Sequence, residues 1–101
     1  MTKIKEEISF IERTIIGFDE AKFLSDEVAQ HAICMSLITI GECANHLSDE
    51  FIGRHTEIPW VEIIAVRNIS AHSYWQLDMK QIWKAIVEDI PALKNFIITQ
   101  T

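Results

Sequence analysis

The sequence predicts an all-α fold, an antiparallel four-helix bundle with a kinked or split C-terminal helix. Three observations lead to this prediction. The 101 residues include only three glycines and two prolines, so residues that favour turns are scarce. Apolar residues recur every three or four positions and do not alternate with polar ones, which is the period of a helix. The length suits one domain, residues 1–101, and short connections between helices favour an antiparallel bundle.

The first expected helix lies in the first fifteen residues. Its apolar residues at helical spacing are Ile4, Ile8, Ile11 and Ile15. Gly17 is expected to end this helix, because glycine adopts the backbone conformation that ends many helices. Residues 18–26 are then expected to form a loop.

The second helix is expected to begin at Ser25 or Asp26, since both residue types cap helix N-termini. One face is marked over about six turns by Ala29, Ile33, Ser36, Ile40, Ala44 and Leu47. Gly41 lies inside this helix, where glycine costs about 1 kcal/mol relative to alanine. Close approach of another helix is the reason we expect for it.

A polar connection is expected over residues 48–58. Pro59 suits the first position of a third helix, where its missing N–H is no loss. This helix is expected to run from Trp60 into the stretch 67–74. The fourth begins at Asp78, with Gln81 as a capping-box partner.

The C-terminal part of the fourth helix contains Pro91. A proline inside a helix removes a hydrogen bond and crowds the preceding turn. We therefore expect either a kink or a new helix with Asp89 as its cap.

The two cysteines, Cys34 and Cys43, fall in the second helix. Nine residues of helix separate them by roughly 13 Å, too far for a disulfide. This predicts two reduced, buried thiols and a reducing compartment. The first ten residues lack the apolar stretch of a signal peptide, and no apolar run is long enough to span a bilayer. We expect a cytoplasmic protein.

The formal net charge is −6 and is unevenly distributed. Residues 1–50 carry four Lys or Arg against ten Asp or Glu, whereas residues 51–101 carry five of each. Non-specific nucleic-acid binding depends on neutralising phosphates, so this composition opposes an extended RNA groove. The high apolar content of so small a chain favours a homodimer.

Four chemically useful side chains gather at the end of the third helix: Arg67, Asn68, His72 and Tyr74. Asn68 and His72 are four residues apart and share a helix face, so Asn68 is placed to hydrogen-bond the imidazole. Arg67 and His72 are five apart, which rotates them by roughly 140°. Either the helix breaks near His72 or a second copy of the chain completes the site.

An Arg–His site without metal ligands suits RNA cleavage by the 2′-hydroxyl group, and no cofactor is expected. His72 acts as general base or acid. Arg67 holds the phosphate and stabilises its developing charge. The alternative is that such a pair is a surface or capping feature, which is the commoner occurrence for an isolated Arg and His.

Other polar and aromatic residues have competing interpretations. His31, His46 and His55 have no metal-like spacing and are best interpreted as solvated or core-edge residues. Glu42 is either a buried partner for Arg67 or an exposed edge residue. The three tryptophans, Trp60, Trp75 and Trp83, are expected to be packing anchors in preference to base-stacking platforms.

The runs ITIGECANHLSDEF and HTEIPWVEIIAVRNISAHSYWQLDMKQIWKAIVEDIPALKNFI resemble the HepT-like branch of the HEPN superfamily. The likeness covers nearly the whole chain and is weakest over the first two dozen residues. Its signature is Arg, four residues, His, any residue, Tyr, found here as Arg67, His72 and Tyr74, with the polar Asn68 after the arginine. Ala71 departs mildly from the larger aliphatic residue usual before the histidine.

The resemblance implies the toxin of a type II- or type VII-like toxin–antitoxin module. Such toxins are metal-independent endoribonucleases that act as homodimers with their Arg–His motifs facing one another. The implied partner is an MntA-like minimal nucleotidyltransferase, which silences the toxin by transferring AMP from ATP to the motif tyrosine, here Tyr74. The alternative is a non-catalytic HEPN partner, or a nucleotide-binding subunit, of such a transferase.

Overall fold

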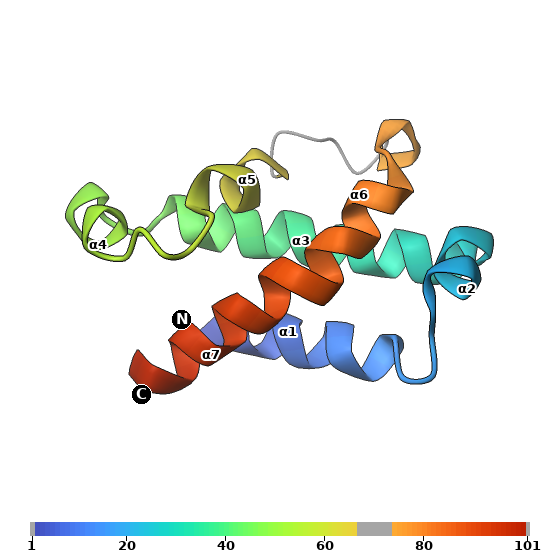
Figure 1. The fold of residues 1–101 in the computed structure, drawn as a ribbon. Coiled ribbons are helices and arrows are strands. Elements are labelled where there is room, and N and C mark those ends of the chain that lie inside the picture. Colours follow the sequence, from blue (N-terminus) through green and yellow to red (C-terminus); the bar gives the residue numbers. More distant parts are fainter. Residues whose placement is uncertain (1, 67–73, 101) are drawn as a thin grey trace.

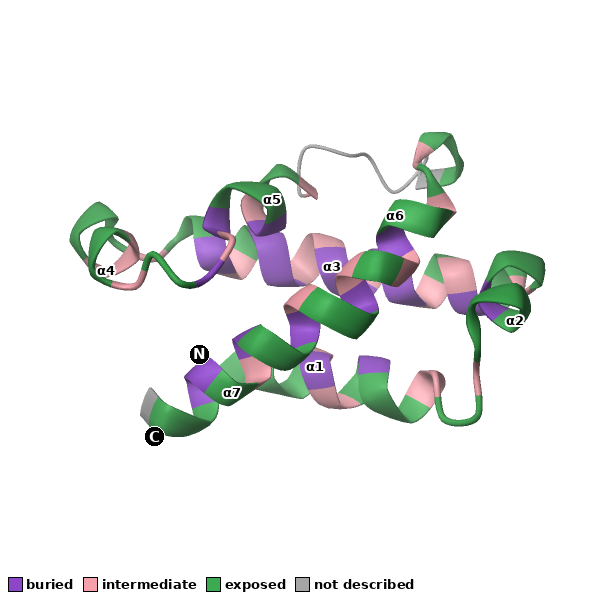
Figure 2. Ribbon diagram, in the orientation of Figure 1, coloured by how far each residue is buried: buried purple, intermediate pink, exposed green. Residues whose placement is uncertain are grey.

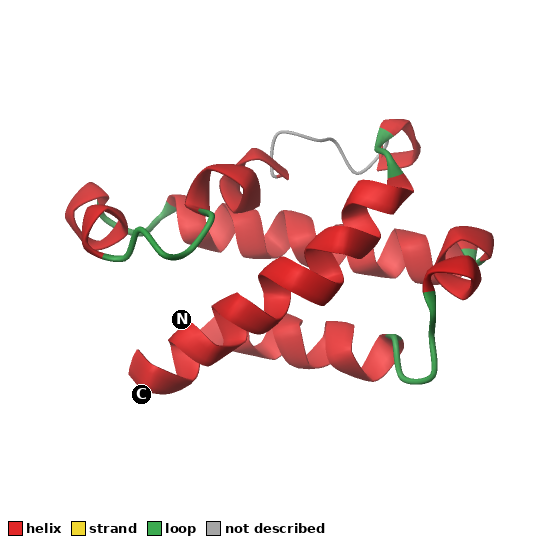
Figure 3. Cartoon of the chain, in the orientation of Figure 1, coloured by secondary structure: helices red, strands yellow, loops and turns green. Residues whose placement is uncertain are grey.

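The structure, a computed structural model, describes residues 2–66 and 74–100, and these residues form helices joined by short loops (Figure 1, Figure 3). The α-helices are α1 (Thr2–Thr14), α2 (Glu20–Ser25), α3 (Glu27–Asn45), α4 (Asp49–Arg54), α5 (Trp60–Ala65), α6 (Met79–Lys84) and α7 (Ile90–Gln100). A 3-10 turn, η2 (Tyr74–Gln76), precedes α6, and a π turn, η3 (Ala85–Asp89), joins α6 to α7. This confirms the all-α prediction.

Helix α1 packs along α3 in the antiparallel direction, and the continuous α6–η3–α7 helix crosses both (Figure 1). The apolar stripe expected from the sequence is the face that α1 buries, since Ile4, Ile8 and Ile11 are all almost fully inaccessible. Gly17 has a φ of +78°, a left-handed conformation that glycine adopts without steric cost. The chain therefore turns out of α1 at the residue expected from the sequence.

Helix α2 lies within the segment 18–26, where the sequence predicts a loop, so that prediction is wrong. Asp19 caps α2 by accepting a 2.8 Å hydrogen bond from the backbone N–H of Lys22. The one buried residue of α2 is Phe23, whose ring lies 5.5 Å from that of Trp83. Six residues with one anchor are too few to show a helical period, and an isolated helix this short is marginal without packing.

Helix α3 begins where one of the two expected caps stands. The carboxylate of Asp26 accepts a 2.9 Å hydrogen bond from the N–H of Ala29, so Asp26, and not Ser25, is the N-cap. The predicted apolar face is buried up to Ala44, while Leu47 lies beyond the helix end and is half-buried. Gly41 is buried as well, and its role in a close helix contact stays a prediction.

The connection expected over residues 48–58 also contains a short helix, α4, which corrects that expectation. The hydroxyl of Ser48 accepts a 3.0 Å hydrogen bond from the N–H of Phe51 and caps it. Helix α4 buries no residue fully, so it leaves no apolar signature in the sequence. Pro59 is the N-cap of α5 and not its first residue.

Asp78 caps α6 as expected, accepting a 2.9 Å hydrogen bond from the N–H of Lys80. Asp89 does not cap a new helix, because it lies within the π turn and the helix continues into α7. Pro91 is the second residue of α7. In a regular helix the Pro91 ring would crowd the carbonyl of Val87. Val87 lies in the π turn, whose backbone is wider than that of an α-helix. The expected kinked or split C-terminal helix is thereby confirmed.

The core lies between the inner faces of these helices (Figure 2). Its fully buried large side chains are Ile4, Ile11, Phe23, Ile33, Ile40, Leu93 and Ile97. Cys34 and Cys43 are both free thiols on α3, as the spacing predicts. Cys34 is buried as expected, whereas Cys43 is only half-buried, so the prediction of burial is wrong for Cys43. Among the described residues, no helix is long and apolar enough to cross a membrane.

Candidate functional site

Three of the predicted site residues, Arg67, Asn68 and His72, lie outside the described residues. The structure describes the chain on either side of them. Helix α5 ends at Ala65, and the 3-10 turn η2 begins at Tyr74. Both lie on the same side of α3 in Figure 1. The expected contacts among the motif residues therefore stay predictions.

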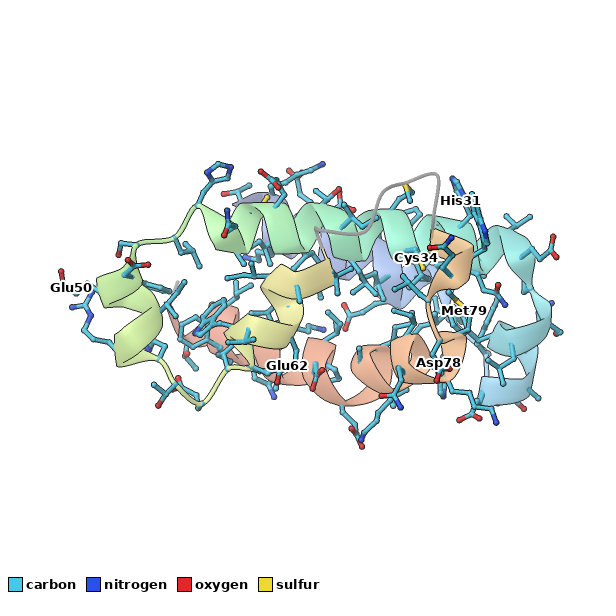
Figure 4. All side chains as sticks on the ribbon, turned by 90° about the horizontal axis from the view of Figure 1, so that it is seen from above. His31, Cys34, Glu50, Glu62, Asp78 and Met79 are labelled. Atoms are coloured by element: carbon cyan, nitrogen blue, oxygen red, sulfur yellow. The ribbon has the colours of Figure 1, made fainter. Side chains whose placement is uncertain are left out.

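A groove of about 230 Å³ lies between α3, α5 and the α6–η3–α7 helix; we call it the α5–α6 groove. Its apolar lining consists of Leu37, Ile40, Ile63, Val66, Ile82, Ala85 and Ile90. Its polar lining is Glu62 on α5, seen in Figure 4, with Gln81 and Asp89 opposite. Val66 immediately precedes Arg67 in the chain, so the groove adjoins the start of the motif.

The polar side of this groove is acidic. Burial raises the pKa of the Asp89 carboxyl, and the nearby carboxylates of Glu88 and Glu62 raise it further, while Lys84 opposes them. Like charges at close range disfavour ionisation, and they also repel phosphate. This side of the groove is therefore unsuited to binding a phosphate group. The sequence showed no pattern linking Glu62, Gln81 and Asp89, because they come from separate elements.

Two of the three histidines outside the motif, His46 and His55, are explained by their local contacts. His55 packs against Phe51 and Phe96, each at a ring distance of 4.7 Å, so it is a core-edge residue as expected. His46 is exposed, and its Nε2 lies 3.3 Å from Oε1 of Glu42. Among the described residues, no three His, Cys, Asp or Glu side chains form a metal-binding cluster.

Glu42 is exposed on the last turns of α3, with half of its side chain accessible. This supports the interpretation as an edge residue and contradicts burial. The pairing of Glu42 with Arg67 stays a prediction, because Arg67 lies outside the described residues.

The three tryptophans differ in their surroundings. Trp60 is buried and Trp83 is half-buried against Phe23, so both are packing anchors. Trp75 in η2 is 64% exposed, so the expectation that it anchors the core is wrong. Trp75 lies in a short exposed turn after the motif and is not part of a helix that covers the core.

Cys34 is not available as a nucleophile. Its thiol is fully buried on the inner side of α3, and burial raises its pKa to about 11 (Figure 4). The thiolate is the reactive form of cysteine, so this group stays neutral near pH 7. Covalent cysteine chemistry is therefore not supported at this position.

Comparison with known proteins identifies related sequences. The family model described as "Ribonuclease HepT-like" matches residues 4–99. A protein named "Probable ribonuclease HepT" from Thermococcus cleftensis is 36% identical over 92 residues, which is 91% of this chain and 84% of that protein.

Two further relatives carry similar descriptions. One from Caldanaerobacter subterraneus subsp. tengcongensis, described as a "putative RNase", is 33% identical over 91% of this chain and 82% of its own length. Another from Methanocaldococcus jannaschii, with the same description, is 30% identical over 76% of this chain and 71% of its own length. No solved structure matches the chain significantly.

Proposed function

Because this chain belongs to the HepT-like ribonuclease family, we propose that it is a metal-independent endoribonuclease that cleaves RNA with Arg67, Asn68 and His72. The observation that carries the proposal is the family match across residues 4–99 together with the intact Arg-x4-His-x-Tyr motif in this sequence.

The proposed reaction is an internal phosphoryl transfer. His72 removes the proton from the ribose 2′-hydroxyl group, and the 2′-oxygen attacks the adjacent phosphorus. The bond from phosphorus to the 5′-oxygen breaks, and that oxygen takes up a proton. Arg67 stabilises the charge that develops on the phosphoryl oxygens. The products are a 2′,3′-cyclic phosphate and a free 5′-hydroxyl group.

The active form in this proposal is a cytoplasmic homodimer. Within one helix Arg67 and His72 are rotated by roughly 140°, so they do not reach the same phosphate. In a dimer whose motifs face one another, one chain supplies the arginine of a site and the other chain supplies its histidine.

We further propose that the protein is the toxin of a toxin–antitoxin module and that an MntA-like nucleotidyltransferase adenylylates Tyr74. Tyr74 is two residues from His72, so a phosphate-bearing adduct there would block the site and repel RNA. The residues that follow it in η2, Trp75 and Gln76, are both exposed, which supports access for a modifying enzyme to this turn.

The alternative is a non-catalytic HEPN partner, or a nucleotide-binding subunit, of a minimal nucleotidyltransferase. The observation that favours it is the net charge of −6, which opposes RNA binding away from the motif. The intact Arg67, Asn68 and His72 favour the ribonuclease.

An RNA-cleavage assay separates these two functions. Wild-type protein should cleave RNA, and His72→Ala and Arg67→Ala should each abolish cleavage. His46→Ala and Arg54→Ala are matched controls, because both residues are exposed and pair with exposed carboxylates, Glu42 and Glu50. Absence of cleavage by the wild type, or equal activity in His72→Ala, would exclude the ribonuclease mechanism.

A further inference from the structure

Trp75 is a large aromatic side chain that the fold leaves in contact with solvent. Its exposed fraction is 64%, whereas that of Trp60 is 4% and Trp83 is half-buried. A packed aromatic side chain buries about 150–250 Å² of surface, and Trp75 forgoes most of that burial. A single exposed apolar residue needs no explanation by itself, so the inference depends on where Trp75 lies.

The turn that carries Trp75 is held in place on its C-terminal side. It is η2, which lies at the N-terminal end of α6 and at the edge of the molecule (Figure 1). Leu77, two residues after Trp75, is half-buried against the hydrophobic core. Asp78 then caps α6 by accepting the hydrogen bond from the N–H of Lys80. The indole is thus exposed on an anchored turn, which reduces the conformational entropy lost when a ligand contacts it.

The position of Trp75 in the sequence keeps it near the proposed general base, His72. Trp75 is the third residue after His72. Three residues of chain span at most about 11 Å, so the two Cα atoms lie within this distance in any conformation. The proposed reaction brings the ribose of the cleaved nucleotide to His72. The base on that ribose and the base of the neighbouring nucleotide are therefore within range of the indole.

The segment around Trp75 is basic, although the chain as a whole is acidic. Residues 67–84 carry three Lys or Arg against one Asp or Glu, whereas the whole chain carries 9 against 15. The charged residues of the segment are Arg67, Lys80 and Lys84 against Asp78. This local excess of positive charge favours RNA phosphates, but so few cations supply only modest affinity. Stacking of a base on an aromatic ring adds affinity that does not depend on the net charge of the protein.

We propose that Trp75 is an RNA-binding residue on which a base beside the cleaved phosphate stacks, so that the substrate is a single-stranded segment of RNA. The inference rests on the proposed function, because it concerns the substrate of the same site. In a double helix the bases stack on one another, whereas unpaired bases can be splayed out onto aromatic side chains. Every base has a face that stacks on an aromatic ring, so Trp75 selects single strands and not a particular sequence.

Binding to an uncleavable strand tests the stacking contact. The probe is a short single-stranded RNA of mixed sequence whose riboses carry 2′-O-methyl groups, so it lacks the attacking 2′-hydroxyl group. Trp75→Ala should raise its dissociation constant about tenfold. Trp75→Phe should keep most of the affinity because it keeps an aromatic ring, whereas Trp75→Leu should bind as weakly as Trp75→Ala. Val28→Ala is the matched control, since Val28 is 82% exposed on α3, and it should bind as the wild type does.

Tryptophan fluorescence separates direct contact from an indirect structural effect. Binding of the 2′-O-methyl strand should quench the fluorescence of the wild type, and the quenching should disappear in Trp75→Phe, which keeps Trp60 and Trp83. The stacking contact is overturned by a wild type that does not bind the strand, by equal affinity of Trp75→Ala or Trp75→Leu and wild type, or by quenching that persists in Trp75→Phe. Unchanged RNA affinity in Trp75→Ala would leave a protein partner as the molecule that contacts this indole.

Cleavage assays distinguish failure of this inference from failure of the proposed function. Ordinary single-stranded RNA should be cleaved faster than the same strand in a duplex. Trp75→Ala should raise KM about tenfold and change kcat little, because the ring binds a base and takes no part in proton transfer. If the wild type cleaves RNA and Trp75→Ala has the same KM, the stacking contact is wrong and the ribonuclease stands. If the 2′-O-methyl strand binds through Trp75 but ordinary RNA is not cleaved, the stacking contact stands and the ribonuclease fails.

Discussion

The indole Nε1 of Trp60 donates a 2.8 Å hydrogen bond to the backbone carbonyl oxygen of His55, and this contact joins the end of α4 to the start of α5. The Trp60 ring is buried and also makes edge-to-face contacts with Phe51 and Phe96, with centroids 6.3 Å and 5.9 Å away. One side chain thereby holds the helix that leads into the motif.

Trp60→Phe should lower the free energy of unfolding by about 0.5–1.5 kcal/mol, because it removes the indole hydrogen bond and leaves the His55 carbonyl with only the 3.3 Å bond from the N–H of Ile58. Urea unfolding followed by circular dichroism measures this loss. Val61→Ala is the control, since Val61 is 78% exposed on the same helix and surface substitutions typically change stability by less than about 0.5 kcal/mol. Equal stability of Trp60→Phe and wild type would show that this hydrogen bond makes no net contribution to the free energy of unfolding.

Alkaline pH should weaken the fold through Cys34. Burial raises its pKa from 9.0 to about 11 in the folded state, so the folded chain retains a proton that the unfolded chain loses. The stabilisation is complete below pH 9 and falls as the pH rises from about 9 to 11. Urea midpoints across this range should decline less steeply for Cys34→Ala than for wild type.

RNA cleavage should be independent of divalent metals. The proposed chemistry uses only Arg67 and His72, and a histidine general base works without a metal ion. Activity should persist in excess EDTA, and the products should carry 2′,3′-cyclic phosphate ends, detected by mass spectrometry. Loss of activity in EDTA that Mg²⁺ or Mn²⁺ restores would contradict this mechanism.

Modification should be confined to Tyr74. Incubation with the cognate nucleotidyltransferase and ATP should increase the protein mass by one adenylyl group and suppress cleavage. Tyr74→Phe should block the addition and keep its cleavage activity, because the phenolic oxygen has no role in the proposed reaction. A Tyr74→Phe variant that folds but cannot cleave RNA would instead give this residue a catalytic role.

Local features were predictable where a few neighbouring residues decide them. The Asp26 and Asp78 caps follow from the affinity of a carboxylate for free N–H groups at a helix start, and both bonds are present. The stripe of Ile4, Ile8 and Ile11 follows from the helical period alone. Family membership likewise rests on sequence, because the motif and its flanking residues carry it.

Features that depend on distant partners were not predictable. Helices α2 and α4 are each six residues long, and so short a helix needs packing or capping from outside its own period. Phe23 of α2 packs against Trp83, which lies far along the chain.

By itself, the sequence determined the helical class, the apolar face of α1 and the Asp78 cap of α6, since each depends on neighbours within a few turns. The predicted third helix, in contrast, ends at Ala65 and not within residues 67–74. The tertiary structure alone decided that Trp60 is buried while Trp75 is exposed, and that one side of α3 is left uncovered. The physical reason is that burial depends on which other helix covers a face, and the apolar residues of α3 are much the same on every side.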